Sequence, residues 1–155
     1  MMKKKPRFSL RNGHPDDYDF VAALYRGTME PLLRALDAWD EAEIMPRFKR
    51  NTIFDQVQII QVDGVDAGWF QITDLSDRLD IAQIHLLEAY RDRGIGGRII
   101  KAVCAEAAGR GLPVTLAVVR GNRARELYER MGFAVEESDP IKFYLRWTER
   151  LVRAG

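Results

Sequence analysis

A glycine-rich segment from Arg91 to Gly97 most constrains what this chain can fold into. It lies between Leu79–Leu87, a run typical of a strand, and a stretch from Gly94 to about Gly109 whose apolar residues recur at helical spacing. Glycines allow unusual backbone angles, and the first amides of a helix have no intrahelical acceptors. The segment therefore predicts a strand-to-helix corner able to bind an anion, aided by the helix dipole. Three arginines suited to phosphate lie in or beside it: Arg91, Arg93 and Arg98.

The spacing of this corner fits the two commoner nucleotide motifs poorly. A Rossmann fingerprint would need glycine at Ile99, and a Walker loop would need Gly-Lys followed by Ser or Thr. On its residues alone, the corner is either a phosphate cradle or a plain glycine-rich connection with solvated arginines.

The elements after the corner predict a parallel pairing in the sheet. Val114–Val119 has the composition of a buried strand, and a helical segment runs from Asn122 to Met131. A strand followed by helix, strand and helix needs a parallel neighbour in the sheet. Two last strands, Phe133–Val135 and Ile141–Trp147, are expected on either side of Asp139-Pro140.

The elements before the corner begin with a short strand at Phe8–Arg11 and a helix that starts near Pro15. Pro31 is expected to interrupt this helix. A second helix is expected to open at Asp40, because Asp40 followed three residues later by Glu43 has the capping-box arrangement.

Three strands are then expected to form an antiparallel series. Ile53–Val62 and Val65–Leu75 are rich in β-branched and aromatic residues, and Asp63-Gly64 between them is a strong signal for a tight hairpin turn. Leu79–Leu87 follows as the third strand.

Length and charge narrow the class of protein. A chain of 155 residues suits one domain, and the net charge of +1 argues against a dedicated nucleic-acid binder. Residues 1–6, with Lys3 to Lys5, are expected to be a flexible tail, and no secretory signal or membrane span is found. Cys104 is the only cysteine, so an intrachain disulfide or a cysteine-rich metal site is excluded. A cytoplasmic location is the default expectation.

Two motifs together resemble a known family. Arg91-x-x-Gly94-x-Gly96 follows a strand, and the segment from Asn122 to Phe133 follows a buried strand; this combination resembles the GNAT superfamily of N-acetyltransferases. The match is densest from about Ile81 to Phe133. Two motifs in the right order and separation are far more specific than either alone. More loosely, Met29-Glu30-Pro31 with Trp39-Asp40 resembles a group of small stand-alone members.

The resemblance implies a fold and a cosubstrate. The fold would be α+β in three layers, with a mixed, splayed sheet of about six to seven strands flanked by about four helices. The cosubstrate would be acetyl-CoA, with no metal. Backbone amides of the corner would hold the pyrophosphate, and the main chain at Leu86 and Leu87 would pair with the pantetheine arm. The implied cofactor-binding residues are Leu86, Leu87, Arg91, Asp92, Arg93, Gly94, Ile95, Gly96, Gly97 and Asn122.

This binding mode also implies a shape for the sheet. The strand at Leu86 must diverge from Val114–Val119 to leave a slot for the cofactor. A bulge in Leu79–Leu87 would help to produce that divergence.

Tyr128 is the candidate for chemistry. Its helical spacing with Ala124, Leu127 and Met131 fits a core aromatic residue, but the resemblance places it where the family has its general acid. A phenol near pKa 10 could protonate a thiolate near 8.5 at a cost of about 2 kcal/mol. Asn122 would position the cofactor, cap its helix, or both.

The general base and the acceptor stay open. His85, Glu88, Asp80 and Glu30 are plausible bases by location, as is a water chain. Cys104, in the middle of a helix, is not expected to take part. The acceptor, a small-molecule or peptide amine, would bind to the segment from Tyr25 to Phe54. Candidate acceptor residues are Trp39, Phe48, Asp37, Asp40, Glu41 and Glu43.

Two other functions compete with an acetyltransferase. One is a non-catalytic acyl-CoA-binding or sensing domain of the same fold, and the other is a nucleotide-phosphate protein unrelated to acyl transfer. The protein is expected to be a monomer or homodimer that binds neither nucleic acid nor membrane.

Overall fold

The antiparallel half of the sheet is built around the Asp63-Gly64 turn. In the computed structural model, which describes residues 7–149, Asp63 has φ 51° and Gly64 has φ 76°. Two left-handed residues are what a two-residue hairpin turn requires. The turn joins β2 (Val57–Val62) to β3 (Val65–Asp74), as predicted. On either side, β1 (Ser9–Asn12) pairs antiparallel with β2, and β4 (Leu79–Leu86) with β3.

The other half of the sheet begins with the predicted parallel pairing. β5 (Val114–Val119) runs parallel to β4, and β7 (Lys142–Trp147) and β6 (Ala134–Ser138) follow in antiparallel order. The described residues thus form a seven-stranded mixed sheet in the order β1-β2-β3-β4-β5-β7-β6. This confirms the predicted fold class.

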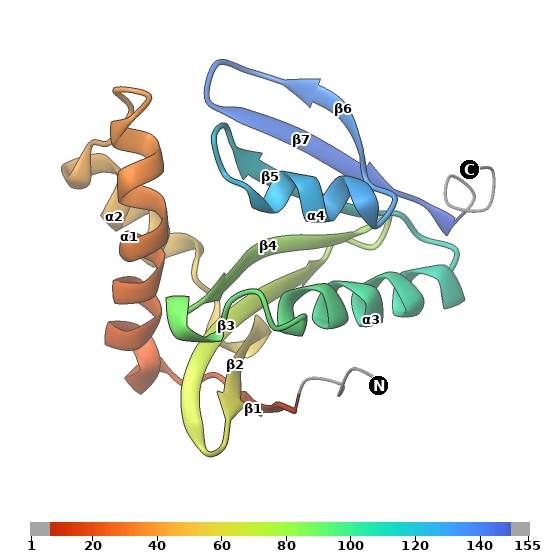
Figure 1. Ribbon diagram of the computed structural model, residues 1–155, viewed down its shortest axis with the longest axis horizontal. Helices are drawn as coiled ribbons and strands as arrows, with labels where there is room; N and C mark the ends of the chain where they lie inside the picture. The colour runs from red at the N-terminus through yellow and green to blue at the C-terminus, as the bar shows by residue number, and fades with distance from the viewer. Residues whose placement is uncertain (1–6, 150–155) are drawn as a thin grey trace.

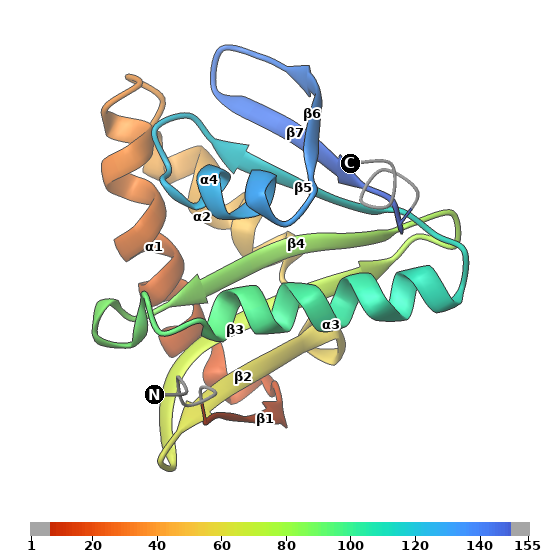
Figure 2. The same cartoon turned by 45° about the vertical axis from the view of Figure 1, so that its right-hand side comes forward.

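Helices cover both faces of this sheet. They are α1 (Tyr18–Arg34) and α2 (Glu41–Asn51) on one face, and α3 (Ile95–Gly109) and α4 (Ala124–Arg130) on the other. Figures 1 and 2 show α3 and α4 on the same side of the sheet, with α1 and α2 away from them. Among residues 7–149, no helix is both long and apolar enough to cross a membrane.

The core therefore lies in two layers. Beneath α1 and α2, Val21, Ile59 and Trp69 are fully buried. On the opposite face, Ile100 of α3 packs in one buried cluster with Leu145 of β7. Burial on both faces explains why the central strands are nearly continuous apolar runs.

The first helix does not stop at Pro31, so that prediction is wrong. A 3₁₀ turn (Pro15–Asp17) leads into α1, which continues through Pro31 to Arg34. A proline inside a helix costs about 3 kcal/mol because it removes one N–H bond and crowds the preceding turn. Leu33, which follows Pro31, is buried in the core, and this tertiary burial offsets the local penalty.

The second helix begins where predicted, but the predicted capping box does not form. Asp40 is the N-cap residue of α2, yet its side chain accepts no hydrogen bond from the helix. The Asp40 carbonyl accepts from the amides of Glu43 and Ile44, at 3.2 and 2.7 Å. Asp40 contributes instead to the wall of a cavity, which removes its carboxylate from the capping role.

The sheet splits between β4 and β5. The two strands pair at only three positions: Leu79 with Val114, Asp80 with Thr115, and Ile81 with Leu116. On the β3 side, the register shifts after Gln71 and leaves Ala82 without a partner, which is a β-bulge. Beyond it β4 and β5 separate toward their carboxyl ends, which lie beside α1 (Figure 1). The predicted divergence and the predicted bulge are both confirmed.

A close approach that only glycine allows holds β4 beside this split. Gly68 in β3 lies opposite Leu86, and a Cβ added at Gly68 would lie 2.3 Å from the His85 carbonyl oxygen. A side chain at Gly68 would therefore force β4 away from β3.

Replacing Gly68 by alanine should lower the free energy of unfolding by about 2–3 kcal/mol, a usual cost of overpacking, as measured by urea denaturation. Gly27→Ala is the matched control, because a Cβ added at Gly27 in α1 meets nothing within 4 Å. That variant should gain about 0.5–1 kcal/mol, since alanine is favoured over glycine in helices. Unchanged stability of Gly68→Ala would contradict the close approach.

Candidate functional site

The corner from Arg91 to Gly97 joins β4 to α3 through a 3₁₀ turn (Glu88–Tyr90) and two left-handed residues. Asp92 has φ 61° and Gly94 has φ 83°. The first three amides of α3 have no intrahelical acceptor because they open the helix, and no side chain caps them. Free amides at the positive end of a 15-residue helix favour the binding of a phosphate group.

The three arginines of the corner are exposed, but each rests on a protein group. The Arg91 Nε donates to the Leu86 carbonyl at 2.9 Å. The Arg93 guanidinium lies 5.5 Å from the centre of the Tyr90 ring, and that of Arg98 lies 6.0 Å from another aromatic ring. These contacts keep positive charge close to the start of α3.

Leu86 and Leu87, at the end of β4, differ in where their main-chain groups point, although the resemblance assigns both to the pantetheine arm. The Leu87 amide donates to the Ala67 carbonyl at 2.8 Å, and the Leu87 carbonyl accepts from the Tyr90 amide at 2.9 Å. Alternate residues of an antiparallel ladder turn their polar groups to opposite sides. Leu86 therefore turns its N–H and C=O toward β5, where β4 has no partner strand. Because the Leu86 carbonyl accepts from Arg91 Nε, the Leu86 N–H is the group left open at this end of β4.

The first turn of α3 faces both this edge and α4. A Cβ added at Gly96 would lie 3.9 Å from Leu86 Cδ1, and one added at Gly97 would lie 3.7 Å from Leu127 Cδ1. The split in the sheet is therefore flanked by α3 and α4 on this face (Figure 2).

Asn122 opens the second motif by ordering the turn before α4. Its Oδ1 accepts from the Ala124 amide at 2.9 Å, and its own amide donates to the Val119 carbonyl at 3.1 Å. The N-cap residue of α4 is Arg123, not Asn122, so Asn122 orders the turn before the helix, and its contact with the cofactor stays a prediction.

Tyr128 projects from α4 into the core, where its ring centre lies 6.2 Å from that of Phe133. It is buried in one cluster with Ile81 and Leu116, the last residues at which β4 and β5 pair. Burial alone raises the pKa of Tyr128 to about 12, and no hydrogen bond contributes. The phenol is therefore protonated at neutral pH, and its role as an acid stays a prediction.

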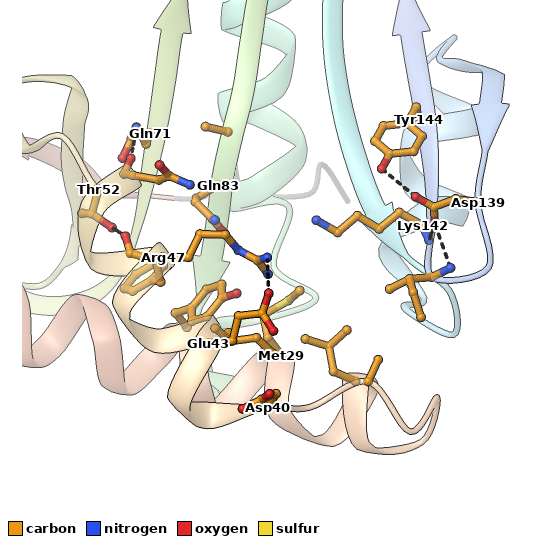
Figure 3. A pocket seen from close by; sticks show the side chains of 18 of the residues that line it. Met29, Asp40, Glu43, Arg47, Thr52, Gln71, Gln83, Asp139, Lys142 and Tyr144 are labelled. Atoms are coloured by element: carbon orange, nitrogen blue, oxygen red, sulfur yellow. Dashed lines mark hydrogen bonds and ion pairs between the residues drawn. The ribbon is translucent and has the colours of Figure 1, made fainter.

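A cavity of about 550 Å³ lies on the opposite face of the sheet, beneath α1 and α2. Its remaining walls come from β3, β4 and the chain around β7 (Figure 3). Ala82, the bulge residue of β4, lines it together with Asp80 and Gln83. The cavity therefore reaches the place where β4 and β5 separate.

The β7 wall of this cavity is ordered by Asp139. One carboxylate oxygen accepts from the amides of Ile141 and Lys142, at 2.8 and 2.6 Å, and the other accepts from the Tyr144 hydroxyl at 2.8 Å. These hydrogen bonds lower the pKa of Asp139, that from the Lys142 amide most. Lys142 and Tyr144 are thereby held in the cavity wall.

The β4 wall is ordered by a buried histidine. Burial, assisted by the charge of Arg91, lowers the pKa of His85 to about 3, so the ring is neutral. Its Nε2 lies 2.7 Å from Oε1 of Gln83 and donates to it, while the buried Nδ1 has no partner. Gln83 is left with its NH₂ group for the cavity.

Of the four candidate bases, only Asp80 lines the cavity; its Oδ1 accepts from the Thr115 hydroxyl at 2.7 Å. Glu30 is paired with Arg34 at 2.7 Å. Glu88 borders a separate space of about 250 Å³ next to Arg91. His85 is buried, and its low pKa makes it a weak base.

Of the residues predicted to bind the acceptor, some line the cavity and others do not. Phe48, Asp40 and Glu43 line the cavity. Trp39, Asp37 and Glu41 do not, and Glu41 is paired with Arg26 instead.

Several cavity residues were not identified from the sequence: Gln83, Arg47, Lys142 and Tyr144. They come from three separate elements, β4, α2 and β7, and no local pattern joins them. The one sequence signal near them, Asp139-Pro140, marks only the boundary between the two last predicted strands.

Neither a thiol nor a metal centre is found at this site. Cys104 is buried in α3, and burial raises the pKa of its thiol to about 12. Within residues 7–149, no three His, Cys, Asp or Glu side chains are grouped so as to hold a metal ion.

Comparison with known proteins identifies the family. The family model described as the acetyltransferase (GNAT) family matches residues 19–133, which include both motifs and most of the cavity. The chain belongs to the GNAT acetyltransferase family. A search of curated proteins finds no match.

Solved GNAT structures share the fold. The PaiA N-acetyltransferase of Thermoplasma acidophilum, solved in complex with coenzyme A, has a TM-score of 0.74 at 14% identity; the match covers 92% of this chain and 99% of that one. A GCN5-related N-acetyltransferase of Rhodopseudomonas palustris has a TM-score of 0.67 at 20% identity, covering 96% and 98%. N-acetylglutamate synthase of Neisseria gonorrhoeae, complexed with coenzyme A and N-acetyl-glutamate, has a TM-score of 0.65 at 19% identity, covering 93% and 35%.

The buried His85 predicts how the stability of this GNAT protein depends on pH. The unfolded histidine takes up a proton below its ordinary pKa of 6.5, whereas the folded one does so only near 3. Stability should therefore rise with pH between these values. From pH 6.5 to 4.5, urea denaturation should show the wild type losing about 2 kcal/mol more than His85→Gln. Equal losses for His85→Gln and the wild type would show that His85 titrates normally.

Proposed function

We propose that this protein is an N-acetyltransferase that moves the acetyl group of acetyl-CoA directly to the primary amine of a small acceptor. The observation that carries the proposal is that the split between β4 and β5 and the cavity beneath α1 and α2 meet at Ala82. The split leads from Ala82 to the phosphate-binding corner on the face of α3 and α4, and the cavity opens from Ala82 on the face of α1 and α2. A thioester in the split would meet an amine in the cavity without an enzyme-bound intermediate.

The corner and the open edge of β4 would hold the cosubstrate. The first amides of α3, with Asp92 and Gly94 in left-handed conformation, would bind the pyrophosphate. The Leu86 N–H would bond to the pantetheine arm as to an added strand, because it faces the side where β4 has no neighbour, while Arg91 holds the Leu86 carbonyl.

Transfer would proceed by direct attack. The amine nitrogen bonds to the thioester carbonyl carbon, the carbonyl oxygen takes on negative charge, and the carbon–sulfur bond then breaks. Main-chain amides on the open edge of β4, from Ala82 to Leu86, would polarise that oxygen. The Leu87 amide is excluded from this role because it donates to Ala67.

Tyr128 would protonate the departing thiolate. In support, Tyr128 belongs to the same buried cluster as Ile81 and Leu116, the last paired residues of β4 and β5, and no hydrogen bond contributes to the pKa of its hydroxyl. With its pKa raised to about 12, donation to a thiolate near 8.5 is uphill by about 5 kcal/mol. The sulfur must therefore bind close enough to the phenol for proton transfer to accompany bond breaking.

Asp80 would receive the acceptor amine. A lysine-like ammonium costs roughly 4.6 kcal/mol to deprotonate at pH 7. It must lose one proton before its nitrogen attacks and a second after the carbon–nitrogen bond forms; one of the two is released to solvent and the other replaces the proton that Tyr128 gives to sulfur. The Asp80 carboxylate would bind the ammonium through the oxygen that Thr115 does not occupy, and water in the cavity would carry the released proton away.

Replacing Gly96 by glutamate should weaken coenzyme A binding at least about 30-fold, or about 2 kcal/mol, by isothermal titration calorimetry. A Cβ at Gly96 points toward Leu86, so a longer acidic side chain would enter the split and repel the pyrophosphate. Gly109→Glu, at the other end of α3 and with open space around it, should bind coenzyme A like the wild type. Equal affinities would remove the corner as the binding site.

Tyr128→Phe should slow acetyl transfer at least tenfold, measured as release of free thiol from acetyl-CoA with a competent amine. Coenzyme A affinity and thermal stability should stay nearly unchanged, because the lost hydroxyl has no hydrogen bond in the protein. Tyr18→Phe, at the start of α1, serves as the control with normal turnover. Full activity of Tyr128→Phe would remove Tyr128 as the acid.

The same assay separates the enzyme from a non-catalytic acyl-CoA-binding domain. Amines, polyamines, amino acids, aminoglycosides and peptide N-termini would each be offered with acetyl-CoA. Coenzyme A binding without thiol release from any of them would favour the binding domain.

A further inference from the structure

Lys142 lies in the wall of the cavity beneath α1 and α2 and makes no ion pair within residues 7–149, although its charge adds to the hydrogen bonds that lower the pKa of the neighbouring Asp139. Its side chain extends from β7 into the cavity (Figure 3). Both oxygens of the neighbouring Asp139 carboxylate are engaged by backbone amides and by Tyr144. Within residues 7–149, no carboxylate lies within ion-pair distance of the Lys142 ammonium.

A second cation, Arg47, enters the same cavity from α2, on the opposite wall (Figure 3). Its Nη1 lies 4.0 Å from Oε1 of Glu43, at the outer limit of an ion pair, and both side chains are more than half exposed. Such a pair contributes little. Arg47 therefore keeps most of its capacity to bind another anion.

Gln83 adds neutral donors between these cations and the split. Because His85 donates to Oε1 of Gln83, the side-chain NH₂ group of Gln83 is left for the cavity. An amide NH₂ and two cations form a set of donors that suits a carboxylate.

A negatively charged side chain, that of Asp80, lies near the point where β4 and β5 separate. Asp80 is next to the bulge at Ala82, and its Oδ1 is held by Thr115. A carboxylate at this place suits an ammonium group. The cavity thus has Asp80 beside the split, and Lys142 and Arg47 between β7 and α2, where Asp40, Glu43 and Asp139 also lie.

From the positions of these charges we propose that the acceptor is a small molecule carrying a free carboxylate as well as the amine, an amino acid being the simplest example. The inference rests on the proposed acetyl transfer. Lys142 and Arg47 bind the carboxylate, and Asp80 binds the amine that reacts. A polyamine is the competing acceptor, because Asp40 and Glu43 also line the cavity and would attract a second ammonium; its use is one outcome of the test.

Matched acceptors test this inference with the full-length enzyme and acetyl-CoA. Phenylalanine would be compared with phenylalaninamide and phenethylamine, and lysine with cadaverine, in each case by thiol release. The wild type should show kcat/KM at least tenfold higher for the free acids, as expected when a charge-assisted hydrogen bond is removed. Lys142→Met should abolish this preference mainly through a higher KM for the acids, whereas Lys101→Met, an exposed residue of α3, should retain it.

The outcomes distinguish this inference from the proposed function. Equal use of the acids and their uncharged or decarboxylated counterparts by the wild type, or better use of cadaverine, would overturn the carboxylate site while leaving acetyl transfer intact. A preference for the acids that survives in Lys142→Met would also overturn it. No thiol release with any amine would overturn the proposed function itself.

Discussion

The parting of β4 and β5 after three paired residues is the constraint on which the rest of this structure depends. Main-chain groups beyond Ile81 would otherwise bond to β5 and close the sheet. The bulge at Ala82 turns the strand away, and Gly68 lets β3 hold the end of β4 close beside His85. The corner that follows can then present its free amides next to an open strand edge.

The two faces of the sheet carry different functional groups. On one face, the corner at the start of α3 gathers amides and arginines, which suit phosphate. On the other, charges of both signs line one cavity. Three buried polar atoms, Thr28 Oγ1, Trp69 Nε1 and His85 Nδ1, have no partner within residues 7–149. Such groups reduce stability and are typical near functional sites, and here His85 orients Gln83 toward the cavity.

Local sequence signals predicted correctly those elements whose conformation depends on neighbouring residues alone. Asp63-Gly64 specifies its turn because only certain residues accept two positive φ angles, and the periodic run after Gly94 specifies α3. Local signals failed where packing or another contact competes. Pro31 stays in α1 because Leu33 is buried, and Asp40 lines the cavity instead of capping α2.

The sequence by itself determined the element order, the mixed sheet and the corner, because each depends on neighbouring residues or on two motifs in a set order. It also marked Tyr128, but only through its place in the second motif. The tertiary structure alone decided which main-chain groups are open, at Leu86 and not Leu87, and which charges share a cavity. Asp80, Arg47 and Lys142 are far apart along the chain, and only the split sheet and the helix pair above it bring them together.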